Sequence, residues 1–244
     1  MDIKIVIPAR YESSRYPGKP LVNIKGKSLL LRVYEKCVSA VGKQNTYVAT
    51  DDQRISDHCK EHDMNCIMTS SNCLTGTDRV YEAVKQLKCS NIINVQGDEP
   101  LITKEDILKI IRETKLNPEL VHCGMCDIDD PDDFFSCHVP KIVTDNKNYL
   151  LYASRAGIPT NKKHQFIKAK RQVCIYSFPS NALYDFYEYG RKSKNEEIED
   201  IEILRFLDLG HKVKMVEISK NPIAVDTKED AEMLIKYLED NNLE

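Results

Sequence analysis

Residues 3–20, IKIVIPARYESSRYPGKP, place an apolar run directly before a loop that is rich in cations and hydroxyl groups. The run from Ile3 to Pro8 is rich in β-branched residues, which predicts a buried strand. Arginine and lysine bind phosphate well, so residues 9–20 form a candidate anion-binding loop. A solvated basic loop is an equally good interpretation of its composition alone. The residues of interest in this loop are Arg10, Ser13, Ser14, Arg15, Gly18 and Lys19.

Strand-like and helix-like segments alternate over roughly the first 130 residues. The further predicted strands are residues 45–49, 66–69 and 91–96, and the predicted helices are residues 28–41, 52–63, 78–87 and 103–114. Ser28 and Thr103 stand where N-caps belong, Asp106 stands at the N3 position after Thr103, and Gly42 stands where a helix ends. This alternation predicts an α/β fold with a parallel sheet and helices on both faces.

The pattern changes from Val121 onward. Short strands are predicted at residues 121–128, 141–144, 149–153, 172–178 and 212–218. Helices are predicted at residues 182–189 and 199–209, the second closed by Gly210, and Thr227 opens a last helix. The pattern from Val121 onward predicts a mixed sheet or an excursion of the chain from the first sheet.

The composition limits the possible classes of protein. The chain has 244 residues and a mass of 28.0 kDa, the size of one large domain or of one domain with an insertion. Hydrophobic residues make up 41% and charged residues 30%, which excludes a disordered or collagen-like chain. The net charge of −3 argues against a broad nucleic-acid surface, and the apolar runs are too short for membrane insertion.

The N-terminus and the cysteines predict a cytoplasmic protein. The segment MDIKIVIPAR lacks the basic region, apolar stretch and cleavage site of a signal peptide. Nine cysteines are an odd number in a long chain, so we expect reduced thiols that mostly act as small buried hydrophobic groups. Zinc is the alternative for Cys123-x-x-Cys126 near His122, Cys137 and His138, although a Cys-His succession is poor ligand spacing.

Two further patterns receive the simpler interpretation. His58 and His62 are spaced as i and i+4 on a predicted helix, but the His-Glu-x-x-His order is absent, so we interpret them as a solvated face. The aromatic residues near the predicted helix 182–189 favour a core or a dimer contact over a base-stacking platform.

Acidic residues follow the predicted strands, at the edge where open parallel sheets bind ligands. Asp98 follows the strand 91–96, and Asp226 follows a later strand and its loop. Mg²⁺ typically takes one or two protein carboxylates plus phosphate oxygens. A turn is the alternative for Asp98, and a helix N-cap is the alternative for Asp226, Asp51 and Asp52. With the basic loop, which matches neither the P-loop nor the dinucleotide fingerprint, these acids predict a nucleotide-using enzyme.

A set of longer motifs runs along essentially the whole chain. IPARYESSRYPGKPL at 7–21 is followed by ATDD at 49–52, TGTDR at 75–79, NVQGDEPL at 94–101, SRAxIP at 154–159 and VDTxED at 225–230. In order and spacing these motifs resemble the CMP-Kdo synthetases (3-deoxy-manno-octulosonate cytidylyltransferases), which are relatives of the other CMP-sugar synthetases.

The resemblance implies a single cytidylyltransferase domain over residues 1–244 with the Rossmann-like nucleotidyltransferase fold. This fold is a mixed, mostly parallel sheet with helices on both faces and a small protruding dimerisation part. The implied substrates are CTP and a 3-deoxy-ulosonic acid sugar, and the implied products are a CMP-sugar for surface glycan synthesis and pyrophosphate. The resemblance also implies Mg²⁺ as cofactor and a homodimer.

The resemblance assigns roles by matched position. The implied catalytic residues are Lys19, Asp98 and Asp226, of which the two aspartates are the implied Mg²⁺ ligands. The implied CTP-binding residues are Pro8, Ala9, Arg10, Ser13, Arg15, Lys19, Thr77 and Arg79. The implied acceptor-binding residues are Gln96, Arg155, Gln172, Tyr176, Glu199 and Glu202.

The acceptor side departs from the family's pattern. The family has His-x-Gly-Ile-Tyr where this chain has residues 172–176, QVCIY, so a sugar-binding histidine is replaced by Gln172. Cys73 stands where the family usually has a histidine, Ile203 stands where it often has a glutamine, and the segment 159–172 is shorter. Loss of a hydrogen-bonding partner changes substrate discrimination strongly.

Several acceptors and one other class of protein therefore remain open. Kdo, an 8-amino or otherwise modified Kdo, and a different acidic, phosphate or phosphonate acceptor are alternatives within the enzyme class. A non-catalytic nucleotide-binding relative is the other class. The retention of Arg15, Lys19, Asp98 and Asp226 argues against it.

Overall fold

The computed structural model describes residues 3–13, 15–87, 89, 91–220 and 223–243, so Ser14 of the basic loop lies outside the described residues. This part of the chain forms a nine-stranded sheet and a two-stranded hairpin. The large sheet consists of β1 (Ile3–Pro8), β4 (Thr46–Thr50), β5 (Cys66–Met68), β6 (Asn91–Val95), β7 (Val121–Ile128), β8 (Lys141–Thr144), β9 (Leu150–Ser154), β10 (Ala169–Pro179) and β11 (Val213–Glu217). The hairpin consists of β2 (Asn23–Ile24) and β3 (Lys27–Ser28).

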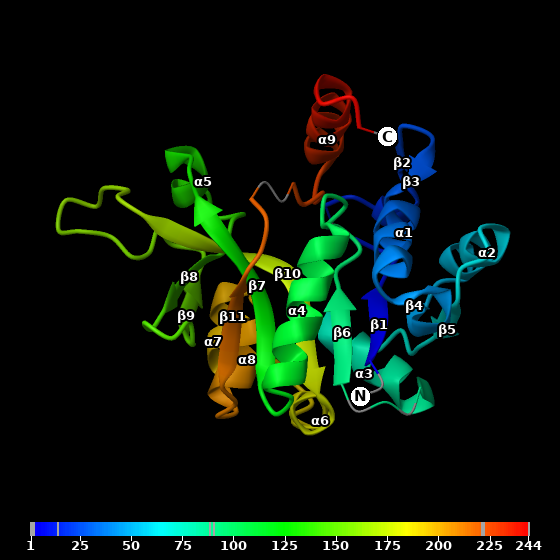
Figure 1. Cartoon of the computed structure of the whole chain (residues 1–244), viewed down its shortest axis with the longest axis horizontal. Coiled ribbons are helices and arrows are strands. Elements are labelled where there is room, and N and C mark those ends of the chain that lie inside the picture. Colours follow the sequence, from blue (N-terminus) through cyan, green and yellow to red (C-terminus); the bar gives the residue numbers. More distant parts are fainter. Residues whose placement is uncertain (1–2, 14, 88, 90, 221–222, 244) are drawn as a thin grey trace.

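Helices connect most of these strands (Figure 1). They are α1 (Leu29–Val41), α2 (Gln53–Glu61), α3 (Gly76–Leu87), α4 (Lys104–Leu116), α5 (Pro131–Phe135), α6 (Ser180–Glu188), α7 (Lys194–Glu199), α8 (Ile203–Asp208) and α9 (Lys228–Asp240). There are also two short 3₁₀ turns among the described residues. The first, η1 (Lys19–Leu21), precedes β2, and the second, η2 (Lys43–Asn45), precedes β4.

The main path of the large sheet runs in the order β11-β7-β10-β6-β1-β4-β5. β1 pairs in parallel with β4 and β6, β4 pairs in parallel with β5, and β7 pairs in parallel with β11. β10 is antiparallel to both β6 and β7, so it separates the two parallel groups. The sheet is therefore mixed and mostly parallel along this path, with β8 and β9 extending from β10.

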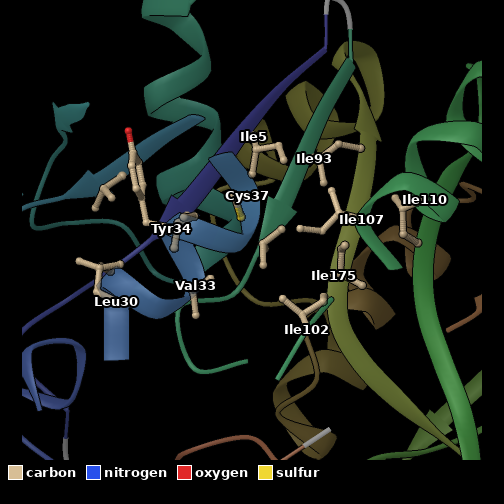
Figure 2. Close-up of a cluster of buried hydrophobic side chains, with 14 of the residues drawn as sticks. Ile5, Leu30, Val33, Tyr34, Cys37, Ile93, Ile102, Ile107, Ile110 and Ile175 are labelled. Carbon is tan, nitrogen blue, oxygen red and sulfur yellow. The ribbon is translucent and has the colours of Figure 1, made fainter. Parts of the chain in front are cut away.

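Alternate residues of the central strands serve two cores. Ile5 and Ile7 of β1 belong to a core with α1, α2 and α4, and Val6 belongs to a second core with α3, α6 and α8. Figure 2 shows side chains of α1 and α4 packed together with Ile5, Ile93 and Ile175 of the sheet. The apolar surface that these strands bury on both faces is the main stabilising contribution to the fold.

A third, smaller cluster joins α9 to the β2–β3 hairpin. Ile24 and Leu29 pack against Val225, in the segment before α9, and against Ala231, Leu234 and Leu238 of α9. In Figure 1 this helix stands beside the hairpin, at the end of the molecule away from α6. The cluster holds the segment that leads into α9, which carries Asp226, against the segment that follows the basic loop.

The helix-start signals in the sequence are confirmed. The side chain of Ser28 accepts a hydrogen bond from the amide of Leu31 at the start of α1, and Gly42 is the C-cap with a φ of 82°. Thr103 and Thr227 form capping boxes with Asp106 and Asp230. These local hydrogen bonds satisfy amide groups that the first turn of a helix leaves unpaired.

One structural prediction was wrong. The predicted helix 199–209 forms only from Ile203 to Asp208, as α8, because Glu199 is the last residue of α7 and Asp200 ends that helix with a left-handed φ of 52°. The mixed sheet predicted from Val121 onward is confirmed, since the antiparallel β10 inserts between β6 and β7. The short elements β2, β3, α5 and most of α7 have no counterpart among the predicted segments.

Candidate active site

A cavity of about 410 Å³ opens at the carboxyl ends of β1 and β6. Its lining includes residues from both strand ends, from the start of α3, from β10 and from the segment before α9. Of the residues that the sequence predicted for the site, those that line it are Pro8, Ala9, Arg10, Ser13, Arg15, Lys19, Arg79, Gln96, Asp98, Arg155, Gln172, Tyr176, Glu202 and Asp226. Segments from the whole length of the chain thus meet at the sheet edge that the strand order predicts.

The basic loop is closed by a backbone contact before it reaches Lys19. The amide of Gly18 donates a hydrogen bond to the carbonyl of Tyr11 at 2.8 Å. Gly18 has a φ of 75°, and a Cβ atom on it would lie 3.1 Å from the Tyr11 ring. Glycine is therefore required both for the backbone conformation and for the close approach of the ring. The closed loop starts the η1 turn at Lys19 and directs its ammonium group into the cavity.

Lys19 lies between the two aspartates. Its Nζ atom is 2.8 Å from Oδ2 of Asp98 and 3.1 Å from Oδ1 of Asp226. Burial lowers the pKa of Lys19, but the two carboxylates outweigh that effect and raise it above its usual value. Burial likewise raises the pKa of Asp226, yet Lys19 and Arg15 hold it below its usual value. Lys19 is therefore cationic and Asp226 anionic at neutral pH.

One backbone hydrogen bond and one ion pair hold the two aspartates in place. The amide of Val225 donates to the carbonyl of Asp98 at 2.9 Å, so the segment before α9 is joined to the end of β6. The guanidinium of Arg15 contacts the other oxygen of Asp226 at 3.1 Å. Carboxylate oxygens that converge on one cationic nitrogen are also suitable ligands for a hard divalent cation such as Mg²⁺.

Arg79 and Thr77 lie on α3 but have different surroundings. The guanidinium of Arg79 contacts Asp51 at 3.0 Å and donates to the hydroxyl of Thr69 at 2.7 Å, and it lines the cavity. Thr77 is outside the cavity lining, because its hydroxyl donates to Glu202 at 2.6 Å. The Glu202 carboxylate also accepts the amide of Thr77, so it caps α3. Burial raises the pKa of this carboxyl.

The side of the cavity for which the sequence predicted acceptor-binding residues is formed mainly by β10. The side-chain amide of Gln172 donates to the hydroxyl of Tyr176 at 2.8 Å, and both side chains are buried. A bulge between Val173 and Tyr176 changes the strand register, so these side chains approach more closely than four residues of regular strand allow. The sequence predicted both residues, and the structure brings them together.

Arg155 is held rigidly beside this pair. Its guanidinium donates to the backbone carbonyls of Cys137, Glu199 and Asp200 at 2.6–2.9 Å. The carboxylate of Glu199 accepts the Arg155 amide at 2.8 Å and the Ser154 hydroxyl at 2.7 Å. Glu199 is outside the cavity lining, so it positions the end of β9 rather than contacting the cavity.

Glu99 is a cavity residue that the sequence prediction missed. It is buried, and one carboxylate oxygen accepts the backbone amide of Cys174 at 3.0 Å. Burial, with a smaller contribution from Asp98, raises its pKa to about 7. The sequence places Glu99 directly after Asp98, but its hydrogen bond to β10 depends on the bulge, which no local pattern indicates.

Three basic residues of the cavity wall were also missed. Arg171 precedes Gln172 on β10, His138 follows Cys137, and Lys192 precedes α7. Arg171 contacts Asp133 at 3.3 Å, and Lys192 contacts Asp200 at 2.6 Å. Arg171 could have been found because it is adjacent to Gln172, which the sequence predicted for the site. No predicted site residue is adjacent to Lys192.

The zinc alternative for Cys123 and Cys126 is wrong. Residues three apart on a strand point to opposite faces, and Cys123 lies in the core with α3 while Cys126 lies in the core with α4. Cys123 and Cys126 are both free thiols. Burial raises the pKa of the Cys126 thiol to about 11. Within the described ranges, no helix is long and apolar enough to cross a membrane.

Comparisons with known proteins agree with this geometry. The family model described as cytidylyltransferase matches residues 4–217. An 8-amino-3,8-dideoxy-manno-octulosonate cytidylyltransferase of Shewanella baltica is 38% identical over 243 residues, covering 94% of this chain and 96% of the relative. A mitochondrial 3-deoxy-manno-octulosonate cytidylyltransferase of Arabidopsis thaliana is 35% identical, covering 98% and 83%. The solved structure of a CMP:2-keto-3-deoxy-manno-octonic acid synthetase complexed with CTP is 30% identical, with a TM-score of 0.91 over 99% of this chain and 100% of that one.

Proposed function

The chain belongs to the CMP-Kdo synthetase family of CTP-dependent cytidylyltransferases, and on that basis we propose that it transfers the cytidylyl group of CTP to Kdo or 8-amino-Kdo. The observation that supports this most is the convergence of Lys19 on Asp98 and Asp226, at the end of the basic loop. That arrangement places cationic and carboxylate groups where a triphosphate with its metal ion would bind.

The basic loop and Lys19 would hold the triphosphate. Arg10, Ser13 and Arg15 line the same cavity as Lys19 and supply guanidinium and hydroxyl donors. Arg79, fixed by Asp51 and Thr69, would lie beside the cytidine. Charge neutralisation and positioning provide most of the catalysis in transfers of this kind.

Mg²⁺ is the proposed cofactor, and the residues present fit it. Asp98 and Asp226 offer hard oxygen ligands whose positions are fixed by the Val225–Asp98 backbone contact. When bound there, Mg²⁺ would neutralise phosphate charge and lower the pKa of the attacking hydroxyl. Lys19, beside the two carboxylates, would offset charge on the leaving pyrophosphate.

The transfer itself needs no covalent enzyme intermediate. The anomeric oxygen of the sugar forms a bond to the α-phosphorus of CTP while the bond to the bridging oxygen breaks. Pyrophosphate leaves in line, and the hydroxyl proton passes to solvent. The chain's contribution is to align the two substrates, with Arg155, Gln172 and Tyr176 on the acceptor side.

The acceptor is proposed as Kdo or its 8-amino derivative because relatives named for both sugars match nearly the whole chain. The test is pyrophosphate release from CTP and Mg²⁺ with Kdo, 8-amino-Kdo, a sialic-acid-type sugar and a small phosphonate. Turnover with either Kdo sugar at least tenfold above the others is the expected result. Preferential turnover of the sialic-acid-type sugar or the phosphonate would overturn the acceptor assignment.

A homodimer is part of the proposal. The strands β8 and β9, with the loop that leads to β10, protrude from the sheet (Figure 1). Exposed apolar side chains occur on and beside this part, at Phe135, Leu151 and Ile167. A second copy would cover them. Light scattering of Leu151→Glu should give the monomer mass, whereas Met233→Glu on α9 should leave the dimer intact; equal masses for the two variants would contradict this interface.

A cytoplasmic location is also proposed. The free thiols of the buried Cys37, Cys59, Cys123 and Cys126 support it, because disulfides persist mainly in oxidising compartments. CTP, the nucleotide substrate, is consistent with the same compartment.

A further inference from the structure

The last turn of α2 brings metal-binding side chains together, outside the cavity described above. His58, Glu61 and His62 each offer a ligand atom, and these atoms lie within 4.8 Å of one another. The spacing i, i+3, i+4 places them on one face of the helix. None of the three lines the active-site cavity.

His58 is oriented by a contact outside its own helix, so it is not simply part of a solvated face. Its Nε2 atom lies 2.7 Å from the hydroxyl oxygen of Ser28, the N-cap of α1. When Nε2–H donates to that oxygen, the lone pair of Nδ1 is free to bind a cation. A histidine that binds a metal usually has its other ring nitrogen fixed in this way.

The electrostatic surroundings favour a cation. His62 is the C-cap of α2, and the C-terminal end of a helix carries partial negative charge. The neighbouring cation Lys60 is paired with Asp57 at 3.1 Å. Burial, and to a smaller degree His62, lowers the pKa of His58, so that its imidazole is neutral at pH 7.

From this geometry we propose that His58, Glu61 and His62 bind one Zn²⁺ ion, at a site separate from the Mg²⁺ ligands. Imidazole nitrogens suit Zn²⁺ far better than Mg²⁺, which prefers oxygen ligands. Glu61 supplies the third ligand, and water completes a tetrahedron. The rings of His58 and His62 have centroids 4.3 Å apart, close enough to turn toward a shared ion.

Isothermal titration of the full chain with Zn²⁺ tests the site, with Mg²⁺ in large excess to occupy the oxygen ligands. A Cys137→Ser background removes the exposed thiol as a competing ligand. The wild-type site should bind one ion, and His62→Ala and Glu61→Gln should weaken binding at least tenfold. His164→Ala, a change of an exposed histidine elsewhere, should leave the affinity unchanged.

Co²⁺ spectroscopy provides the second readout. Nitrogen-ligated tetrahedral Co²⁺ should give intense visible absorption in the Cys137→Ser protein, and His62→Ala should lose it. Because His62 is exposed, this variant should keep the circular dichroism spectrum of the folded chain. Either undetectable Zn²⁺ binding or a Zn²⁺ affinity that is the same in His62→Ala and His164→Ala would overturn the proposal.

Discussion

The carboxylate of Glu99 accepts a hydrogen bond from the backbone amide of Cys174 at 3.0 Å. The amide of Gln96 donates to the carbonyl of the same Cys174 at 3.0 Å. The loop that carries Asp98 is thereby joined to the bulge of β10 that places Gln172 against Tyr176. The proposed metal half and the proposed acceptor half of the site are held together at this one residue.

This relationship predicts a role for Glu99 in binding the acceptor. Glu99→Gln keeps a hydrogen-bond acceptor for Cys174, whereas Glu99→Leu removes it and frees the bulge. We expect the acceptor KM to rise about tenfold in the leucine variant, which corresponds to one hydrogen bond. The glutamine variant should stay close to wild type, and the KM for CTP should change little in both. A leucine variant with an unchanged acceptor KM would show that the contact does not position the acceptor half.

Lys19 should be essential for turnover. Lys19→Met removes the charge that contacts Asp98 and Asp226 and that would offset charge on pyrophosphate. We expect kcat to fall by about 10²–10³, as for the loss of other groups that stabilise transition-state charge. Lys27→Met, at a lysine outside the cavity, is the matched control. If Lys19→Met kept the full kcat, Lys19 would not be a catalytic residue.

Gln172 should influence the choice of acceptor. Its amide nitrogen donates to Tyr176, which leaves the amide oxygen to accept a hydrogen bond, for example from an ammonium group. Gln172→His introduces the residue that the family has at this position. The ratio of kcat/KM for Kdo to that for 8-amino-Kdo should rise about tenfold, with the KM for CTP unchanged. An unchanged ratio would mean that residue 172 does not discriminate between Kdo and 8-amino-Kdo.

His122 should make the stability of the protein depend on pH. It is fully buried on β7, and its ring nitrogens have no hydrogen-bond partner among the described residues. Burial lowers its pKa to about 4, from the usual 6.5. As the pH falls below 6.5 the unfolded chain binds the proton first, so the free energy of unfolding decreases until the pH reaches about 4.

His122 should lower the free energy of unfolding by about 3 kcal/mol over this pH range, because each pKa unit corresponds to about 1.4 kcal/mol. Urea unfolding of the wild type and of His122→Phe at pH 7 and pH 4.5 measures it. The variant should lose less stability on acidification than the wild type, while other groups contribute equally to both proteins. Parallel losses in the two proteins would show that His122 does not titrate abnormally.

Local patterns predicted most of the fold. The bounds of β1, β7 and β8 match the prediction, because β-branched and apolar residues predominate there. The starts of α1, α4 and α9 follow from side chains that cap the first turn. The division between α7 and α8 was missed, since apolar residues on both sides of Asp200 continue a helical period and only its left-handed backbone interrupts it.

The candidate site was predictable only where local sequence carries the chemistry. The basic loop and Asp98 stand at strand ends and could be identified there. The contact of Lys19 with Asp226, across 207 positions, depends on the packing of the segment before α9. The contact of Glu99 with β10 depends on a bulge, and Lys192 lies in the cavity wall beside Asp200, a contact that no local pattern indicates.

Cytidylyl transfer at this site is tested most directly by a ³¹P NMR spectrum of the purified chain with CTP, Mg²⁺ and Kdo. The wild-type chain should form pyrophosphate and a CMP-sugar phosphodiester in equal amounts, and Asp98→Asn should form both products much more slowly. A spectrum in which CTP stays unchanged, or in which it yields CMP and pyrophosphate without a sugar phosphodiester, would contradict the assignment of cytidylyl transfer to this site.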